Sequence, residues 1–310
     1  MVDVLTQPGI PNQYTLSTTC FGGRLKSIED QAFASVAMGF RRIELGLLDA
    51  PVKLNGFEDS RRETGITVGS VVAGCLDPRN ELHVGSRLGS LEENVRECAL
   101  NSLRRHVRLA QRYGASTVVI RGLDLEDKPL REEADRMQAK LLRDGSSDAL
   151  KEEVRQLVAR IEKKSHRQLE HLCRALHALR TEFPETRLAI EGGVGTTDLL
   201  SFASVGWVLD DLDRQGLGYW HDTGRVHLRE RMGLATQGEW LDAYAPRMLG
   251  VHLQDATEFN AELPPGSGEV DFKLVAGFLP SNAERVLEVN PRHGRAEILG
   301  AVQFLSGKGF

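Results

Sequence analysis

The sequence of 310 residues predicts an α/β fold, a (β/α)8 barrel with a helical insertion between the fourth and fifth strands. Eight short apolar and β-branched runs each precede a longer segment of helical period, which is typical of parallel βα units. No Gly-x-Gly-x-x-Gly motif follows the first run, so an open dinucleotide-binding sheet is disfavoured. Polar residues also recur once per unit in the second half of the chain. We therefore expect a single barrel domain over residues 1–310.

The expected strands are short and bounded by turn residues. They comprise residues 13–20, 41–45, 67–74, 116–122, 187–192, 216–222, 248–255 and 284–290. The expected helices follow the helical period and comprise residues 27–39, 56–64, 90–113, 196–215, 239–244, 270–279 and 296–305. Ser27 and Ser90 each stand three residues before an acidic residue, which is a helix-capping pattern. Gly39 and Gly114 stand where helices should end.

One segment exceeds what a minimal barrel needs. Residues 126–182 separate the fourth and fifth strands and are rich in Glu, Lys, Arg, Leu and Ala. We expect two helices broken near the stretch RDGSSDAL, with Ser147 capping the second helix. The inserted part covers approximately 126–165, and the second helix includes one helix of the outer ring. The insertion would cover the site, form a subunit contact or have no role.

Composition excludes several classes of protein. The chain is 41% hydrophobic and 27% charged, which is typical of globular proteins, and its apolar runs are too short to cross a bilayer. A net charge of -5 disfavours a nucleic-acid partner, since phosphate binding needs clustered basic residues. The four cysteines show no Cys-x-x-Cys spacing, and no secretion signal is visible. We expect a cytoplasmic protein with neither membrane nor nucleic-acid partners, and we leave a homo-oligomer open.

Four polar residues recur at the ends of the last four expected strands. Glu191, Asp222, His252 and Glu288 lie 31, 30 and 36 residues apart along the chain. A (β/α)8 barrel has about 31 residues per unit, so the four should lie at one level near the carboxyl ends of the strands. Strand alternation gives them one common direction, because the apolar neighbours on either side point the other way. The residues that share their faces are Ala189, Trp220, Gln254 and Val286.

Three carboxylates and an imidazole at one level would repel one another and lose much solvation. A divalent cation removes both problems. The mixed oxygen and nitrogen set suits Mn²⁺, Co²⁺ or Zn²⁺, and Mg²⁺ less because of the imidazole. We therefore expect one divalent metal ion bound by Glu191, Asp222, His252 and Glu288, although each residue taken alone is also compatible with a solvated strand end.

The sequence resembles the xylose isomerase-like TIM barrel proteins, the sugar phosphate isomerase/epimerase superfamily, over almost the whole chain outside the insertion. The motifs that carry the resemblance are MGFRRIELG, AQRYGASTVVIRG, LAIEGG, YWHDTGRVHL, LGVHLQDAT, PPGSGEVDFKLV and VLEVNPRH. The resemblance implies that Glu191, Asp222, His252 and Glu288 bind the metal. It also implies that Glu191 and Glu288 are catalytic, removing and returning a proton beside a carbonyl while the metal stabilises an enediolate.

The chain departs from the family pattern at two arginines. Many relatives have histidine three residues after the aspartate, and this chain has Arg225. Relatives that cleave DNA at abasic sites use extra histidines, whereas the fourth strand here ends near Arg121. Arginine stays protonated and cannot ligate a metal, but it can grip a carboxylate or a phosphate. The endonuclease function is therefore disfavoured, and Arg225 is a candidate substrate-binding residue.

Other residues near the carboxyl ends of the expected strands are weaker candidates for the site. His83, Glu44 and Arg292 are further candidates for substrate binding, although His83 and Arg292 also fit solvated loops and Glu44 also fits a pair with a nearby arginine. His293 accompanies Arg292 after the eighth strand. His221 has the opposite parity to Asp222, so we expect it to pack behind the site or to hold a ligand in place. His227 is expected on a helix surface.

These observations predict a metal-dependent isomerase or epimerase that acts on a small sugar, sugar phosphate or polyol through an enediolate. A metal-dependent keto-polyol dehydratase or lyase would use the same chemistry and expel a hydroxyl group. A barrel that binds a sugar without converting it is the alternative from another class, and Arg225 gives it some support.

Overall fold

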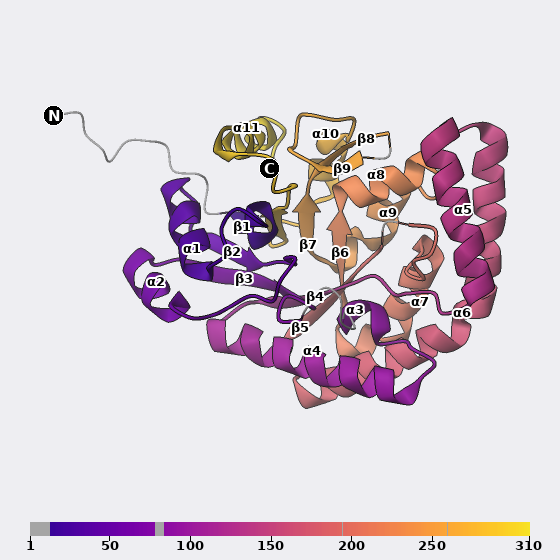
Figure 1. The fold of residues 1–310 in the computed structure, drawn as a ribbon, viewed down its shortest axis with the longest axis horizontal. Coiled ribbons are helices and arrows are strands. Elements are labelled where there is room, and N and C mark those ends of the chain that lie inside the picture. The colour runs from indigo at the N-terminus through magenta and orange to yellow at the C-terminus, as the bar shows by residue number, and fades with distance from the viewer. Residues whose placement is uncertain (1–12, 78–83, 194, 259) are drawn as a thin grey trace.

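The computed structural model describes residues 13–77, 84–193, 195–258 and 260–310, and in it eight parallel strands close into a barrel (Figure 1). The strand order around the barrel is β1-β10-β7-β6-β5-β4-β3-β2. The predicted (β/α)8 fold is therefore confirmed. The barrel strands are β1 (Tyr14–Ser17), β2 (Arg42–Leu45), β3 (Thr67–Val72), β4 (Thr117–Arg121), β5 (Arg187–Glu191), β6 (Gly218–Asp222), β7 (Met248–Leu253) and β10 (Glu284–Leu287).

Each of these strands lies within one of the eight predicted ranges, because short β-branched runs between turn residues are a strong local signal. A small antiparallel hairpin of β8 (Asp255–Thr257) and β9 (Asn260–Leu263) follows β7 and was not predicted. Residue Asp255, placed at the end of the seventh strand by the sequence, starts this hairpin. Its carboxylate accepts hydrogen bonds from the backbone N–H groups of Ala256, Gly266, Gly268 and Val270, which folds the following loop around it.

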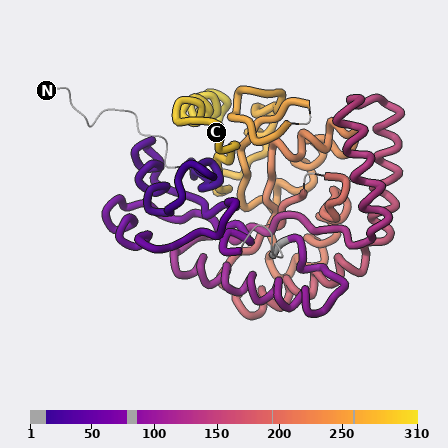
Figure 2. The backbone as a smooth tube through the Cα atoms, in the orientation of Figure 1, coloured from indigo at the N-terminus to yellow at the C-terminus, as the bar shows by residue number. Residues whose placement is uncertain are grey.

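The helices surround the strands, as the continuous backbone trace in Figure 2 shows. Those predicted are α1 (Ile28–Ala37), α2 (Phe57–Thr64), α4 (Glu93–Tyr113), α7 (Phe202–Asp211), α9 (Gln237–Tyr244), α10 (Phe272–Phe278) and α11 (Arg295–Ser306). The structure also has α3 (Val84–Arg87), α8 (Thr223–Arg231) and the 3-10 turns η1 (Thr18–Phe21), η2 (Asp213–Gln215) and η3 (Ala245–Arg247). Of these, η2 lies at the end of the predicted helix over residues 196–215, and α8 carries His227, which was expected on a helix without predicted bounds. No helix in the described part of the chain is long and apolar enough to cross a membrane.

Two helices begin three or more residues later than predicted. Ser27 caps α1 as expected, accepting the N–H of Asp30, but Ser90 does not cap α4. The Ser90 hydroxyl accepts the N–H of Glu92 only two residues on, so the chain turns there and α4 begins at Glu93. Helix α7 begins at Phe202, later than expected, because the carboxylate of Asp198 accepts the N–H of Leu200 and keeps the preceding segment out of the helix.

The insertion forms a helical hairpin, as predicted. Helix α5 (Lys128–Asp144) and helix α6 (Asp148–Glu182) are joined at the predicted break, and the Ser147 side chain accepts the N–H of Leu150 to cap α6. In Figure 1 the hairpin stands at one side of the barrel. A small apolar cluster attaches the hairpin to the end of α8 and comprises Leu141, Leu150, Val154 and Met232.

The barrel interior provides the floor of the polar site. Its buried apolar residues are Val72, Val119, Ala189, Trp220 and Val286. Three of these are the residues predicted to share the faces of Glu191, Asp222 and Glu288, so the predicted strand parity is confirmed. The indole ring of Trp220 packs against the imidazole ring of His252 with centroids 5.2 Å apart. Only glycine fits at position 250, because a Cβ atom there would lie 2.4 Å from the Trp220 ring.

Candidate active site

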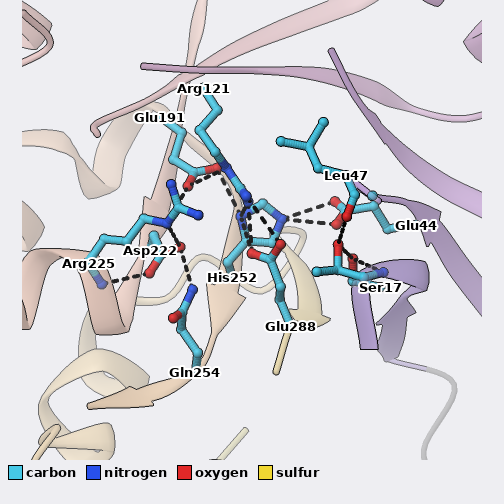
Figure 3. A network of polar contacts seen from close by, with 12 residues as sticks. Ser17, Glu44, Leu47, Arg121, Glu191, Asp222, Arg225, His252, Gln254 and Glu288 are labelled. Atoms are coloured by element: carbon cyan, nitrogen blue, oxygen red, sulfur yellow. Dashed lines mark hydrogen bonds and ion pairs between the residues drawn. The ribbon is translucent and has the colours of Figure 1, made fainter. Parts of the chain in front are cut away.

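The four polar residues that recur once per βα unit meet at the carboxyl ends of the barrel strands, as Figure 3 shows. Glu191 and Asp222 are the last residues of β5 and β6, His252 lies in β7, and Glu288 directly follows β10. All four are buried. Ligand atoms of Glu191, Asp222 and His252 lie within 4.8 Å of one another, whereas Glu288 lies outside this group of three. The nearest oxygen of Glu288, Oε2, is 3.8 Å from Nδ1 of His252.

Arg121 lies among these side chains. It is the last residue of β4 and the direct neighbour of Glu191 across the β4–β5 pair. Its Nε atom is 3.0 Å from Glu191 Oε1, and its Nη1 and Nη2 atoms donate to the two oxygens of Glu288 at 3.2 and 2.8 Å. Nη2 also lies 3.1 Å from His252 Nδ1. The sequence showed Arg121 only as a departure from a pattern, and its contacts with three of the four predicted ligands come from the fold.

Arg225 pairs with Asp222. Its Nε atom lies 3.0 Å from Asp222 Oδ2 and 3.6 Å from Glu191 Oε1, and its backbone N–H donates to Asp222 Oδ1 at 2.9 Å. That backbone contact makes Asp222 the N-cap of α8, so a helix begins directly after β6 at the Thr-Gly step. Gln254 also donates to Asp222 Oδ2, at 2.7 Å. In this structure the guanidinium predicted to grip a substrate anion is engaged by a carboxylate of the protein.

Glu44 holds the imidazole of His252 from the other side. Both of its oxygens lie 3.1 Å from His252 Nε2, and its Oε2 accepts a hydrogen bond from Ser70 at 2.7 Å. The side chain points toward His252 and is completely buried. Its carboxylate is thus occupied by contacts with His252 and Ser70.

Electrostatics keep both glutamates of the site ionised. Burial alone would raise the pKa of Glu288, but Arg121 and His252 lower it to about 2. The same two neighbours outweigh burial at Glu191 and hold its pKa well below the usual range. Burial raises the pKa of Asp222 to about 7, against the opposing effect of Arg225. At His252, the carboxylates of Glu44, Glu191 and Glu288 overcome burial and raise the pKa well above its usual value.

The remaining candidates lie elsewhere. His83 is outside the described residues. Arg292 is exposed beside β10, where its Nε atom contacts His293, and His293 in turn contacts Glu297. His221 packs behind the site as expected, with Nδ1 2.8 Å from the Tyr219 hydroxyl and with no contact to the predicted ligands among the described residues. His227 lies on α8, but only 13% of its side chain is exposed, so the predicted surface position is wrong.

The donors present fit a divalent ion at three positions. Two carboxylates and an imidazole form a set that Mn²⁺, Co²⁺ and Zn²⁺ accept. Oε1 of Glu191 is buried and accepts no well-aligned hydrogen bond from the described residues, although Nε of Arg121 lies 3.0 Å from it. Glu191, Asp222 and His252 therefore form a candidate metal site.

The fold and the site define a class: a closed (β/α)8 barrel with a buried polar cluster at the carboxyl ends of its strands. No protein-family model matches the chain, and no curated protein matches it by sequence. Many solved structures match it in fold.

Three of these structures show the particular kind of barrel. The 3-keto-D-glucoside 4-epimerase of E. coli is 14% identical, with 95% of this chain and 99% of that chain covered and a TM-score of 0.64. D-psicose 3-epimerase of Clostridium cellulolyticum is 12% identical, with coverages of 96% and 99% and a TM-score of 0.64. A xylose isomerase-like TIM barrel protein of Mycobacterium smegmatis, in complex with magnesium, is 13% identical, with coverages of 96% and 97% and a TM-score of 0.58. The chain has the xylose isomerase-like TIM barrel fold.

Proposed function

We propose that this protein is a sugar or polyol isomerase or epimerase that moves a proton on the carbon beside a carbonyl group. The observation that carries the proposal is the pair of buried, ionised carboxylates of Glu191 and Glu288. They come from β5 and from the end of β10, with β6 and β7 between them, and one guanidinium contacts both. A substrate carbon placed between two such groups has a proton acceptor on each of two sides.

Each residue has a defined task in this proposal. One carboxylate removes the proton, and a proton returns either to the same carbon from the other side or to the neighbouring oxygen-bearing carbon. Negative charge then develops on the substrate oxygen, and the mostly buried guanidinium groups of Arg121 and Arg225 stabilise it in a site of low dielectric. Glu44 keeps His252 in place, and Asp222 positions Arg225.

A divalent ion fits the proposal at Glu191, Asp222 and His252. When bound, such an ion supplies a Lewis acid that polarises the substrate carbonyl. Mn²⁺, Co²⁺ and Zn²⁺ suit a site with an imidazole ligand better than Mg²⁺ does. Glu288, the fourth ligand expected from the sequence, is engaged by Arg121 and acts in the proposal as a proton acceptor.

Similar folds support this substrate class. Two of the matching structures are named as epimerases of keto-sugars, 3-keto-D-glucoside 4-epimerase and D-psicose 3-epimerase. Fold likeness at 12–14% identity carries no activity by itself, so the proposal depends on the two carboxylates described above.

The reaction is tested by incubating the purified protein with a panel of ketoses and keto-polyols in D2O. Deuterium should enter at the carbon beside the carbonyl, with no loss of water. Glu288→Gln should abolish this exchange. Glu284→Gln is the matched control, because Glu284 is a buried carboxylate at the start of β10, the strand that Glu288 follows, and it accepts a hydrogen bond from Thr15 at 3.0 Å away from the site.

Other outcomes contradict the proposal. Loss of water from the substrate would show a dehydratase instead, and binding without exchange would show a barrel that holds a sugar unchanged. Normal exchange by a folded Glu288→Gln variant would remove Glu288 from the mechanism.

A further inference from the structure

The guanidinium of Arg121 lies in the middle of the ligand set that the sequence predicted for a metal ion. Three of the four predicted ligands contact it: Glu191 at 3.0 Å, Glu288 at 2.8 Å and His252 Nδ1 at 3.1 Å. Figure 3 shows the Arg121 side chain reaching across the site from β4 to these groups. Only 9% of the side chain is exposed, so this cation is part of the protein interior.

A metal ion and this guanidinium cannot use His252 together. An imidazole nitrogen binds a divalent ion at about 2.0–2.1 Å through one lone pair in the plane of the ring. The space in front of Nδ1 already holds Glu191 Oε2 at 2.9 Å and Arg121 Nη2 at 3.1 Å. Nε2, the other ring nitrogen, faces Glu44. An ion bound by His252 and Glu191 must therefore displace Arg121, which cannot itself ligate a metal.

Displacing Arg121 is costly because of what it leaves behind. Its two Nη atoms donate to the two oxygens of Glu288, and a buried carboxylate that loses its directly hydrogen-bonded cation is strongly unfavourable. The guanidinium groups of Arg121 and Arg225 lie against the carboxylates of Glu191, Asp222 and Glu288. The protein thus already supplies much of the positive charge that a metal ion would bring.

We propose that Arg121 is a built-in cation of this site that competes with a divalent metal ion for Glu191 and His252, so that the wild-type chain binds such an ion weakly. The inference rests on the metal cluster in the proposed function, and it extends that function by naming the residue that controls metal occupancy. Stabilisation of charge on the substrate then falls to the guanidinium groups.

The test is a calorimetric titration with Mn²⁺ of wild-type protein and of the variants Arg121→Met and Arg121→Lys. Arg121→Met should bind Mn²⁺ at least about tenfold more tightly than wild type, a change of about 1.4 kcal/mol. Arg121→Lys keeps a cation and should stay close to wild type. Arg87→Met is the control for loss of positive charge elsewhere, because Arg87 pairs with Asp124 at 3.5 Å outside the cluster.

Two further variants show where the additional Mn²⁺ affinity arises and keep the test valid if Arg121→Met does not fold. Arg121→Met/His252→Ala should lose the gained affinity if the ion binds at the cluster. Arg121→Met/Glu288→Gln removes the carboxylate that the first substitution leaves unpaired, so it should fold and still bind Mn²⁺ more tightly than Glu288→Gln alone. Mn²⁺ should also raise the unfolding midpoint of Arg121→Met and leave that of wild type unchanged.

Two results would contradict the inference, and each would contradict a different part of it. Equally tight binding by wild type and Arg121→Met would overturn the competition while leaving the metal cluster intact. No binding by any of the folded variants at millimolar Mn²⁺ would overturn the metal cluster itself, and the inference with it, without affecting the proton transfer tested by deuterium exchange.

Discussion

Arg121 and Glu191 are direct neighbours across β4 and β5, and Nε of Arg121 lies 3.0 Å from Oε1 of Glu191. The same guanidinium holds Glu288, which lies on the far side of three intervening strands around the barrel. This single side chain therefore joins two parts of the barrel mouth. Its contacts affect stability, metal binding and the ionisation of both candidate proton acceptors.

The first prediction concerns stability. Arg121→Met should lower the free energy of unfolding by about 3–5 kcal/mol, the usual result of leaving a buried charge without its partner. Arg121→Met/Glu288→Gln should recover part of the loss, because one unpaired charge is removed. Urea unfolding at neutral pH with a chelator present measures both. Unfolding free energies for both variants equal to that of wild type would show that Arg121 carries no such role.

The second prediction concerns the orientation of His252. Glu44→Ala should lower the rate of deuterium exchange about 10–100-fold, as expected when the group that orients a functional imidazole is removed. Ser70→Ala is the matched comparison and should have a smaller effect, because it removes only the hydrogen bond to Glu44. Steady-state exchange rates and KM should be measured together. A change in KM alone would instead place Glu44 in substrate binding.

The third prediction concerns the floor of the site. Gly250→Ala should destabilise the protein by about 1–3 kcal/mol, the usual cost of overpacking a core, because the new Cβ lies 2.4 Å from the Trp220 ring. Gly277→Ala in α10 is the control, since nothing lies within 4 Å of a Cβ at that position and alanine favours a helix. Thermal unfolding checks both. Equal midpoints for the two variants would contradict the close contact between β6 and β7.

The fourth prediction concerns pH and the buried His106 on α4. Its Nδ1 lies 2.8 Å from the carbonyl oxygen of Ser102, and its Nε2 accepts the N–H groups of Gly74 and Leu76 at 3.0 and 3.1 Å. The imidazole is therefore neutral, and burial lowers its pKa. A proton on Nε2 would face two donors.

Because the folded pKa of His106 lies below the unfolded value of about 6.5, the unfolded chain binds more protons as the pH falls below that value. The stability contributed by this group is complete above about pH 6.5. It should fall with decreasing pH by up to about 1.4 kcal/mol per pH unit. His106→Gln should flatten this dependence in urea unfolding between pH 7 and pH 5, whereas substituting the exposed His166 should not. An unchanged pH dependence in His106→Gln would contradict the assignment.

Local patterns were sufficient for most of the fold. Short β-branched runs, helical periodicity and caps such as Ser27 and Ser147 act over a few residues, so the strands and the helical hairpin were predicted close to their places. Errors occurred where a distant or competing contact sets the local structure. Asp198 delays the start of α7, and Asp222 caps α8, a helix whose bounds the sequence did not predict.

The sequence by itself determined the barrel and the level at which Glu191, Asp222, His252 and Glu288 meet, because chain spacing and strand alternation are fixed by the geometry of βα units. Tertiary structure alone decided how these groups are used. Arg121 and Glu288 are 167 residues apart in the chain, and Glu44 and His252 are 208 residues apart. Their contacts depend on the register of the strands in the closed barrel and on the length of the side chains. Those contacts place an arginine, in place of a fourth ligand, at the centre of the site.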